Sequence, residues 1–125
     1  FASEILFAAH GLEGAEELAT HLNINLGKFV EKITKCGGDV IKFAGDAALC
    51  VFQAHSADDL AKKTLLATQL SLECIAELER DQYVVEGVRL TAHSGIGCGS
   101  VTGFMAGGLF QRSEFAVIGE PIFQI

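Results

Sequence analysis

Residues 37–52 decide the fold of this chain, and they read GGDVIKFAGDAALCVF. Val40 to Phe43 and Ala48 to Phe52 are short runs rich in strand-forming residues, and Ala44-Gly45-Asp46-Ala47 separates them. Two such runs on either side of Gly-Asp are typical of a β-hairpin. Because both runs are strongly apolar, we expect the two strands to be buried and Asp46 to project from the tip of the hairpin.

Asp46 allows two interpretations. A carboxylate fixed on a rigid turn between two strands is how an enzyme positions a metal ligand for phosphoryl or nucleotidyl transfer. Alternatively, Gly-Asp simply makes the turn, as it does in many hairpins. The local sequence favours the turn and leaves the metal ligand open.

Lys42 stands between two apolar residues, Ile41 and Phe43, and also allows two interpretations. Strand alternation puts it on the face opposite to these two and on the same face as Val40. Its side chain either snorkels from an edge strand or places its ammonium at the mouth of a pocket, where it donates to a ring nitrogen or an anion. Asp39 is expected to be a turn residue between helix and strand.

Helices are predicted on both sides of the hairpin. From Gly14 to Lys35 apolar residues recur at steps of three and four, and Gly37-Gly38 ends this helix. After the hairpin, Ser56 and Asp59 form a capping box, and a helical pattern continues to about Arg80. The apolar residues of this second helix cover a broad face, so we expect it to be substantially buried; they are Leu60, Leu65, Leu66, Leu70, Leu72, Ile75 and Leu78.

The remaining sequence predicts two more strands. Val88 to Ile96 is a strand candidate whose end is crowded by Gly95, Gly97, Gly99 and Gly103, and Phe115 to Gly119 is the last strand, closed by Glu120-Pro121. The glycines are expected to let strand and helix approach closely, because no Gly-Lys-Ser/Thr of a P-loop follows them. The order helix, hairpin, helix, strand, strand predicts an α+β sandwich, and we expect one domain over residues 1–125.

Composition limits the function. The chain has 125 residues, half of them hydrophobic, and a formal charge of −7, which argues against a nucleic-acid binder. A nucleotide substrate stays open, because a bound divalent metal reverses the sign of a carboxylate site. The four cysteines form no CxxC pair and are expected to be small buried residues in a reducing, cytoplasmic compartment. Without an initiator Met or a signal peptide, the chain is expected to be a piece of a longer protein.

Four segments resemble the catalytic domain of class III adenylyl and guanylyl cyclases, and most closely the first catalytic domain of the soluble, bicarbonate-responsive adenylyl cyclases and their bacterial relatives. The hairpin of residues 37–49 carries the resemblance, and three further segments match in the same order: 14–18, 95–101 and 115–121. The resemblance implies a ferredoxin-like palm with flanking helices, an antiparallel sheet, and an active site formed between two such domains.

The resemblance also implies roles for individual residues. Asp46 matches the second of two aspartates that hold a pair of Mg²⁺ or Mn²⁺ ions, and Lys42 matches the lysine that contacts the adenine of ATP. Phe43 and Val117 are expected to line the substrate site with Lys42. In the bicarbonate-regulated relatives the residue matching Val117 contributes to the activator pocket, so bicarbonate is an expected regulator. The implied activity is conversion of ATP to cyclic AMP and pyrophosphate.

The chain also departs from the family pattern. The first metal aspartate belongs to an Asp-Ile-x-Gly-Phe strand, which is expected upstream of Phe1, and the transition-state Asn-x-x-x-Arg pair is expected beyond Ile125. With Phe123 and Gln124, the end of the chain resembles the same segment of family domains that hold the metal ions. Such domains take the transition-state Asn and Arg from a partner domain. We therefore expect a second cyclase domain, in tandem or on another chain, and an inactive isolated fragment. Two alternatives stay open: a non-catalytic pseudo-cyclase that binds a nucleotide or anion, and a ferredoxin-like interaction domain.

Other residues carry weaker expectations. His10, His21, His55 and His93 show no metal-ligand spacing, and His93 is expected in the core or a pocket wall. Met105 to Phe110 is expected to be an arm like the family's dimer contacts or a disordered loop. Arg112 and Glu114 are expected to form a solvated turn pair.

Overall fold

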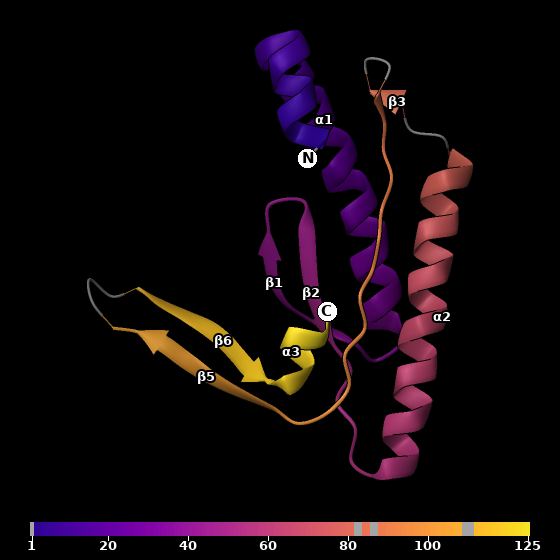
Figure 1. Ribbon diagram of the computed structural model, residues 1–125, viewed down its shortest axis with the longest axis vertical. Helices are drawn as coiled ribbons and strands as arrows, with labels where there is room; N and C mark the ends of the chain where they lie inside the picture. The colour runs from indigo at the N-terminus through magenta and orange to yellow at the C-terminus, as the bar shows by residue number, and fades with distance from the viewer. Residues whose placement is uncertain (1, 82–83, 86–87, 109–111) are drawn as a thin grey trace. The chain divides into compact units, whose positions relative to one another are not determined.

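The computed structural model describes the backbone of residues 2–81, 84–85, 88–108 and 112–125. It describes the side chains of residues 16–17, 19–80, 89–108 and 112–125. The chain divides into two compact units, residues 1–37 with 69–93 and residues 38–68 with 94–125. It contains α-helices and two-stranded antiparallel sheets (Figure 1). The α+β class is therefore confirmed.

The first unit contains the helix α1 (Ala2–Lys35), the second part of α2 (Ala57–Asp81), and the short strands β3 (Val84–Val85) and β4 (Val88–Arg89). The end of α1 is the predicted one, because Gly37 adopts a left-handed φ of 82° that suits glycine beyond a helix C-terminus. Its start lies earlier than Gly14, the predicted first residue.

A narrow apolar stripe of α2 forms the buried part of this unit. Leu70, Cys74 and Leu78 follow one another at steps of four and are each at most 8% exposed, together with Leu90. The polar side chain of Asn25 is also buried, and its Nδ2 donates to the carbonyl oxygen of His21 at 2.9 Å. The predicted broad buried face is too wide, because Leu65 and Leu72 are 70% and 63% exposed.

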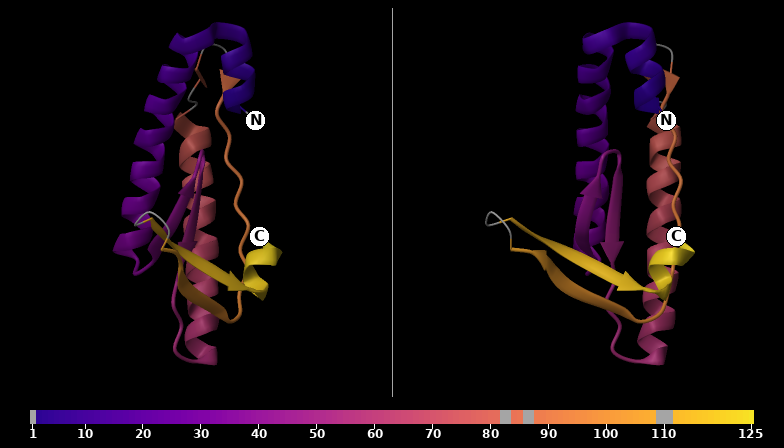
Figure 2. Two further views of the ribbon diagram at one scale, coloured as in Figure 1. Left: turned by 90° about the vertical axis from the view of Figure 1, so that its left-hand side faces the viewer. Right: turned by 60° about the vertical axis from the view of Figure 1, so that its left-hand side comes forward.

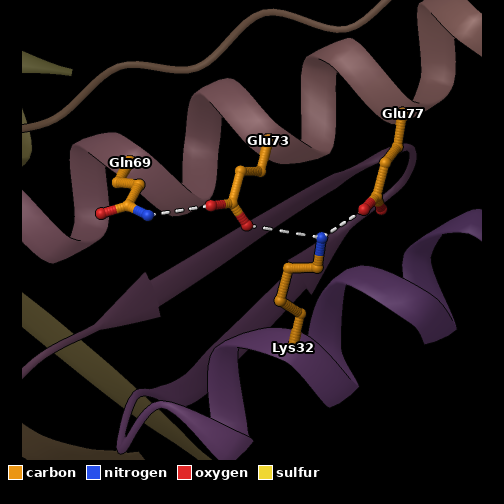
Figure 3. A network of polar contacts seen from close by, with 4 residues as sticks. All are labelled: Lys32, Gln69, Glu73 and Glu77. Carbon is orange, nitrogen blue, oxygen red and sulfur yellow. Dashed lines mark hydrogen bonds and ion pairs between the residues drawn. The ribbon is translucent and has the colours of Figure 1, made fainter.

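A chain of polar contacts ties α1 to α2 in this unit (Figure 3). The Lys32 ammonium donates to Glu77 Oε1 at 2.5 Å and lies 3.7 Å from Glu73 Oε2, and Gln69 Nε2 donates to Glu73 Oε1 at 3.0 Å. The hydrogen bond from Lys32 lowers the pKa of Glu77 against the opposing effect of desolvation, and the same bond raises the pKa of Lys32.

This ion pair predicts an acid-dependent loss of stability. Because the folded state holds the pKa of Glu77 below its ordinary value, the unfolded state binds more protons as the pH falls through the usual glutamate range near about 4.3. The pair's contribution is thus complete above that range and lost below it. Melting curves from pH 7 to pH 3 are expected to show a lower melting temperature for Glu77→Gln at pH 7 and a shallower fall toward acid pH.

The control for this experiment is Glu16→Gln, which removes the same charge from an exposed position on α1. It is expected to leave both the melting temperature at pH 7 and its pH dependence nearly unchanged. Equal pH profiles for Glu77→Gln and the unmodified protein would contradict the assignment of the pair.

The second unit begins with the predicted hairpin. Strands β1 (Asp39–Ala44) and β2 (Ala47–Val51) pair antiparallel, and Ala44 opposite Ala47 closes the turn at Gly45-Asp46. The hairpin and its turn are confirmed. Its burial is not, because every position of the two strands is either half-buried or exposed, and Phe43 is 53% exposed.

The first part of α2 also belongs to this unit and has the predicted cap. The Ser56 hydroxyl oxygen accepts a hydrogen bond from the Asp59 backbone N–H at 3.1 Å, and Asp59 Oδ2 accepts one from the backbone N–H of His55 at 3.0 Å. The returning carboxylate thus reaches one residue earlier than in a standard capping box. Both acceptors stabilise the start of the helix.

The rest of the unit differs more from the sequence prediction. Residues 90–100 contain no strand, so the strand predicted from Val88 to Ile96 is limited to Val88–Arg89. Instead β5 (Val101–Gly107) pairs antiparallel with β6 (Ser113–Gly119), and α3 (Glu120–Gln124) follows directly, with Pro121 in its first turn (Figure 2). The last strand and its exit are confirmed. Residues 105–107 of the expected arm belong to β5, and 109–110 lie outside the described residues.

Strand pairing joins the described strands two by two, as β1-β2, β3-β4 and β5-β6. The single sheet of the expected palm is thus not assembled among them, and the one-domain prediction stays a prediction. None of the helices in the described residues combines the length and the apolar character that crossing a membrane requires.

Candidate functional site

Asp46 lies at the tip of the β1–β2 hairpin. The preceding Gly45 has a left-handed φ of 63°, which is costly for residues with a Cβ, so the sequence Gly-Asp suits this turn. The Asp46 side chain is exposed, and its carboxylate is free to face a ligand from a fixed backbone position. The structure thus supports the turn interpretation. It also leaves the carboxylate of Asp46 exposed to solvent.

A carboxylate is a suitable ligand for Mg²⁺ or Mn²⁺, which prefer oxygen donors. In the described part of the chain, however, no group of three or more His, Cys, Asp or Glu residues lies close enough together to hold a metal ion. Asp46 therefore fits the role of one ligand, and the residues described around it do not complete a metal site.

Lys42 lies on a different face of β1 than strand alternation predicted. The register with β2 shifts by one residue between Val40, which pairs with Cys50, and Lys42, which pairs with Leu49. Residues paired across two strands share a face, and successive residues of β2 alternate. Lys42 therefore lies on the face opposite to Val40. This register shift explains why the predicted face of Lys42 was wrong, because a β-bulge turns the following side chains to the other face of a strand.

The ammonium of Lys42 makes a contact that the sequence did not predict. Its Nζ donates to Glu114 Oε2 at 3.2 Å, and the two side chains are 54% and 78% exposed. Glu114 belongs to the strand β6 and binds Lys42, so the predicted turn pair with Arg112 is wrong, although both side chains are exposed as predicted. Patterns within one segment do not reveal a partner that lies 72 residues away.

Phe43 and Val117 do not share a strand face with this pair. Phe43 pairs with Ala48 and is therefore on the other face of β1 from Lys42. Val117 is half-buried and pairs with Gly103, and alternation puts it on the face of β6 opposite to Glu114. Their roles at a substrate site stay predictions.

Asp39 is the first residue of β1, where it pairs with Val51, so it follows the turn to which it was expected to belong. Its Oδ1 accepts a hydrogen bond from the backbone N–H of Val40 at 2.8 Å, where the chain leaves the helix and enters β1. Burial raises the pKa of the nearby Cys50 thiol, and the negative charge of Asp39 adds to this effect. Cys50 thus stays a thiol near neutral pH and behaves as a small hydrophobic residue.

The glycines before β5 bring the chain close to α3. A Cβ added at Gly97 would lie 2.3 Å from the carbonyl oxygen of Pro121, and one at Gly95 would lie 3.1 Å from Ile125 Cα. The expected role in close approach is confirmed, although an irregular segment replaces the predicted strand. The backbone N–H of Cys98 donates to Gln124 Oε1 at 3.2 Å in the same contact, and the Cys98 side chain is exposed rather than buried as predicted.

The other three cysteines are less exposed than Cys98. Cys74 is buried, Cys36 and Cys50 are half-buried, and all four cysteines are free. His93 is exposed in the irregular segment, so its expected place in a core or pocket wall is wrong. The side chain of His10 lies outside the described residues.

An apolar groove of about 500 Å³ lies in the second unit, away from the β1–β2 hairpin. It is lined mainly by one side of α2, with Leu60, Thr64 and Leu65, and by Cys98. None of the predicted site residues contributes to its lining. The groove therefore gives no support to a nucleotide pocket at the hairpin.

No family model matches the chain, and no solved structure matches it. Among curated proteins, the chain is 34% identical over 109 residues to adenylate cyclase type 10 of Rattus norvegicus, 31% to that of Homo sapiens and 33% to that of Mus musculus. Each match covers 87% of this chain and 7% of the relative, so the chain spans a small part of the proteins it matches. The predicted resemblance of this chain to the class III cyclase family is thereby confirmed.

Proposed function

We propose that this chain is part of an adenylyl cyclase catalytic domain, which converts ATP to cyclic AMP and pyrophosphate. One observation carries the proposal: in a sequence related to adenylate cyclases, an exposed carboxylate, Asp46, stands at the turn of a hairpin that also presents the exposed ammonium of Lys42. A nucleoside triphosphate with its metal ions offers a partner for each group.

In this proposal Asp46 supplies one carboxylate ligand to a pair of Mg²⁺ or Mn²⁺ ions, and the remaining ligands come from other parts of the protein. Such ions activate the ribose 3′-hydroxyl and neutralise charge on the α-phosphate and the leaving pyrophosphate when they are bound. The chain's own contribution is geometric. The tight turn between Ala44 and Ala47 fixes the backbone of Asp46, so little freedom is lost when its carboxylate binds.

Lys42 reads the base in this proposal. An ammonium donates hydrogen bonds and accepts none, so it suits a ring nitrogen that carries a lone pair, as in adenine. Phe43 and Val117 are proposed to line the same site. Bicarbonate is proposed as a regulator that binds beside Lys42, because a small anion is a natural partner for an exposed ammonium.

A second cyclase domain completes the active site in this proposal, and the β5–β6 hairpin offers apolar surface for it. Large apolar side chains on these two strands are 41–63% exposed. Val101, Met105 and Phe115 share one face of the hairpin, and Phe104 and Ile118 share the other, so each face offers apolar side chains for protein contact. The free cysteines suit the reducing cytoplasm in which we propose that the domain works.

The proposal is tested on the natural protein, purified whole, by incubating it with ATP and either Mg²⁺ or Mn²⁺. We expect cyclic AMP and pyrophosphate in equal amounts, by mass spectrometry and a coupled pyrophosphate assay, and no product after chelation. Binding of ATP without turnover would instead identify a pseudo-cyclase that regulates a partner. Absence of both binding and turnover would leave an interaction domain.

A further inference from the structure

We draw no further inference here: the strongest candidate, the apolar groove of the second unit that α2 and Cys98 line, carries none, because nothing among the described residues shows what covers it.

Discussion

Replacement of Asp46 by asparagine is expected to reduce cyclic AMP formation by the natural protein about 10²–10³-fold. A metal ion that neutralises charge in the transition state is worth several kcal/mol, and about 1.4 kcal/mol corresponds to a factor of ten in rate. The asparagine side chain would keep the size and the turn preference of Asp46, but it would offer a neutral amide oxygen where a charged ligand is needed. The loss should be smaller when Mn²⁺ is raised to concentrations that offset weaker binding.

This substitution separates the two interpretations of the hairpin tip. If Asp46 only makes the turn between Ala44 and Ala47, asparagine replaces it well, and both the melting temperature and the activity stay unchanged. If it holds metal, the melting temperature stays and the activity falls. Asp58→Asn, at an exposed position in the first turn of α2, controls for the loss of one negative charge. Full activity of the Asp46→Asn variant would reject the metal ligand.

The parts of the fold that were predictable from the sequence are those that short-range rules decide. Gly45 and Asp46 between two strand-forming runs define a hairpin, and Ser56 with Asp59 defines a helix start. In both cases the partners lie within a few residues of one another, so the chemistry that fixes the structure is visible in one window of the sequence.

The parts of the fold that were predicted wrongly depend on contacts between segments that are distant in the sequence. Strand β5 contains Gly103 and Gly107, which weaken the usual strand pattern, and the Phe115 ring of β6 covers the first of them. The reverse error occurred at residues 90–96, where an apolar pattern lacks a partner strand among the described residues. Pairing, rather than local propensity, decides such segments.

The candidate site shows the same division. Asp46 and Lys42 were found from their neighbours and from the family resemblance, whereas Glu114 was not. No alternation rule predicts a register shift inside a strand, and that shift decides which face Lys42 occupies. The only sequence signal for a partner of Lys42 was the acidic residue Glu114 near the start of a largely apolar strand. An acidic residue in that position has several common explanations.

Replacement of Gly97 by alanine is expected to destabilise the protein by about 1–3 kcal/mol, the usual cost of forcing an extra methyl group into a packed contact. The added Cβ would lie 2.3 Å from Pro121 O, 2.9 Å from Pro121 C and 3.0 Å from Pro121 Cα. All three atoms are backbone, and Pro121 is buried, so no side-chain rotation relieves the clash. The start of α3 would have to move away from the segment that precedes β5.

Gly27→Ala is the matched control, because both variants remove the same backbone freedom from the unfolded chain. A Cβ at Gly27 meets nothing within 4 Å, and alanine is favoured over glycine inside a helix by about 0.8–1 kcal/mol, so this variant should melt at a higher temperature than the unmodified protein. The unfolded-state terms cancel in the difference between the two melting temperatures, which then combines the clash of Gly97→Ala with Pro121 and the helix preference of Gly27→Ala. If Gly97→Ala melts as high as Gly27→Ala, α3 does not pack against residues 95–99, and the end of β6 that carries Val117 toward the proposed site lacks this support.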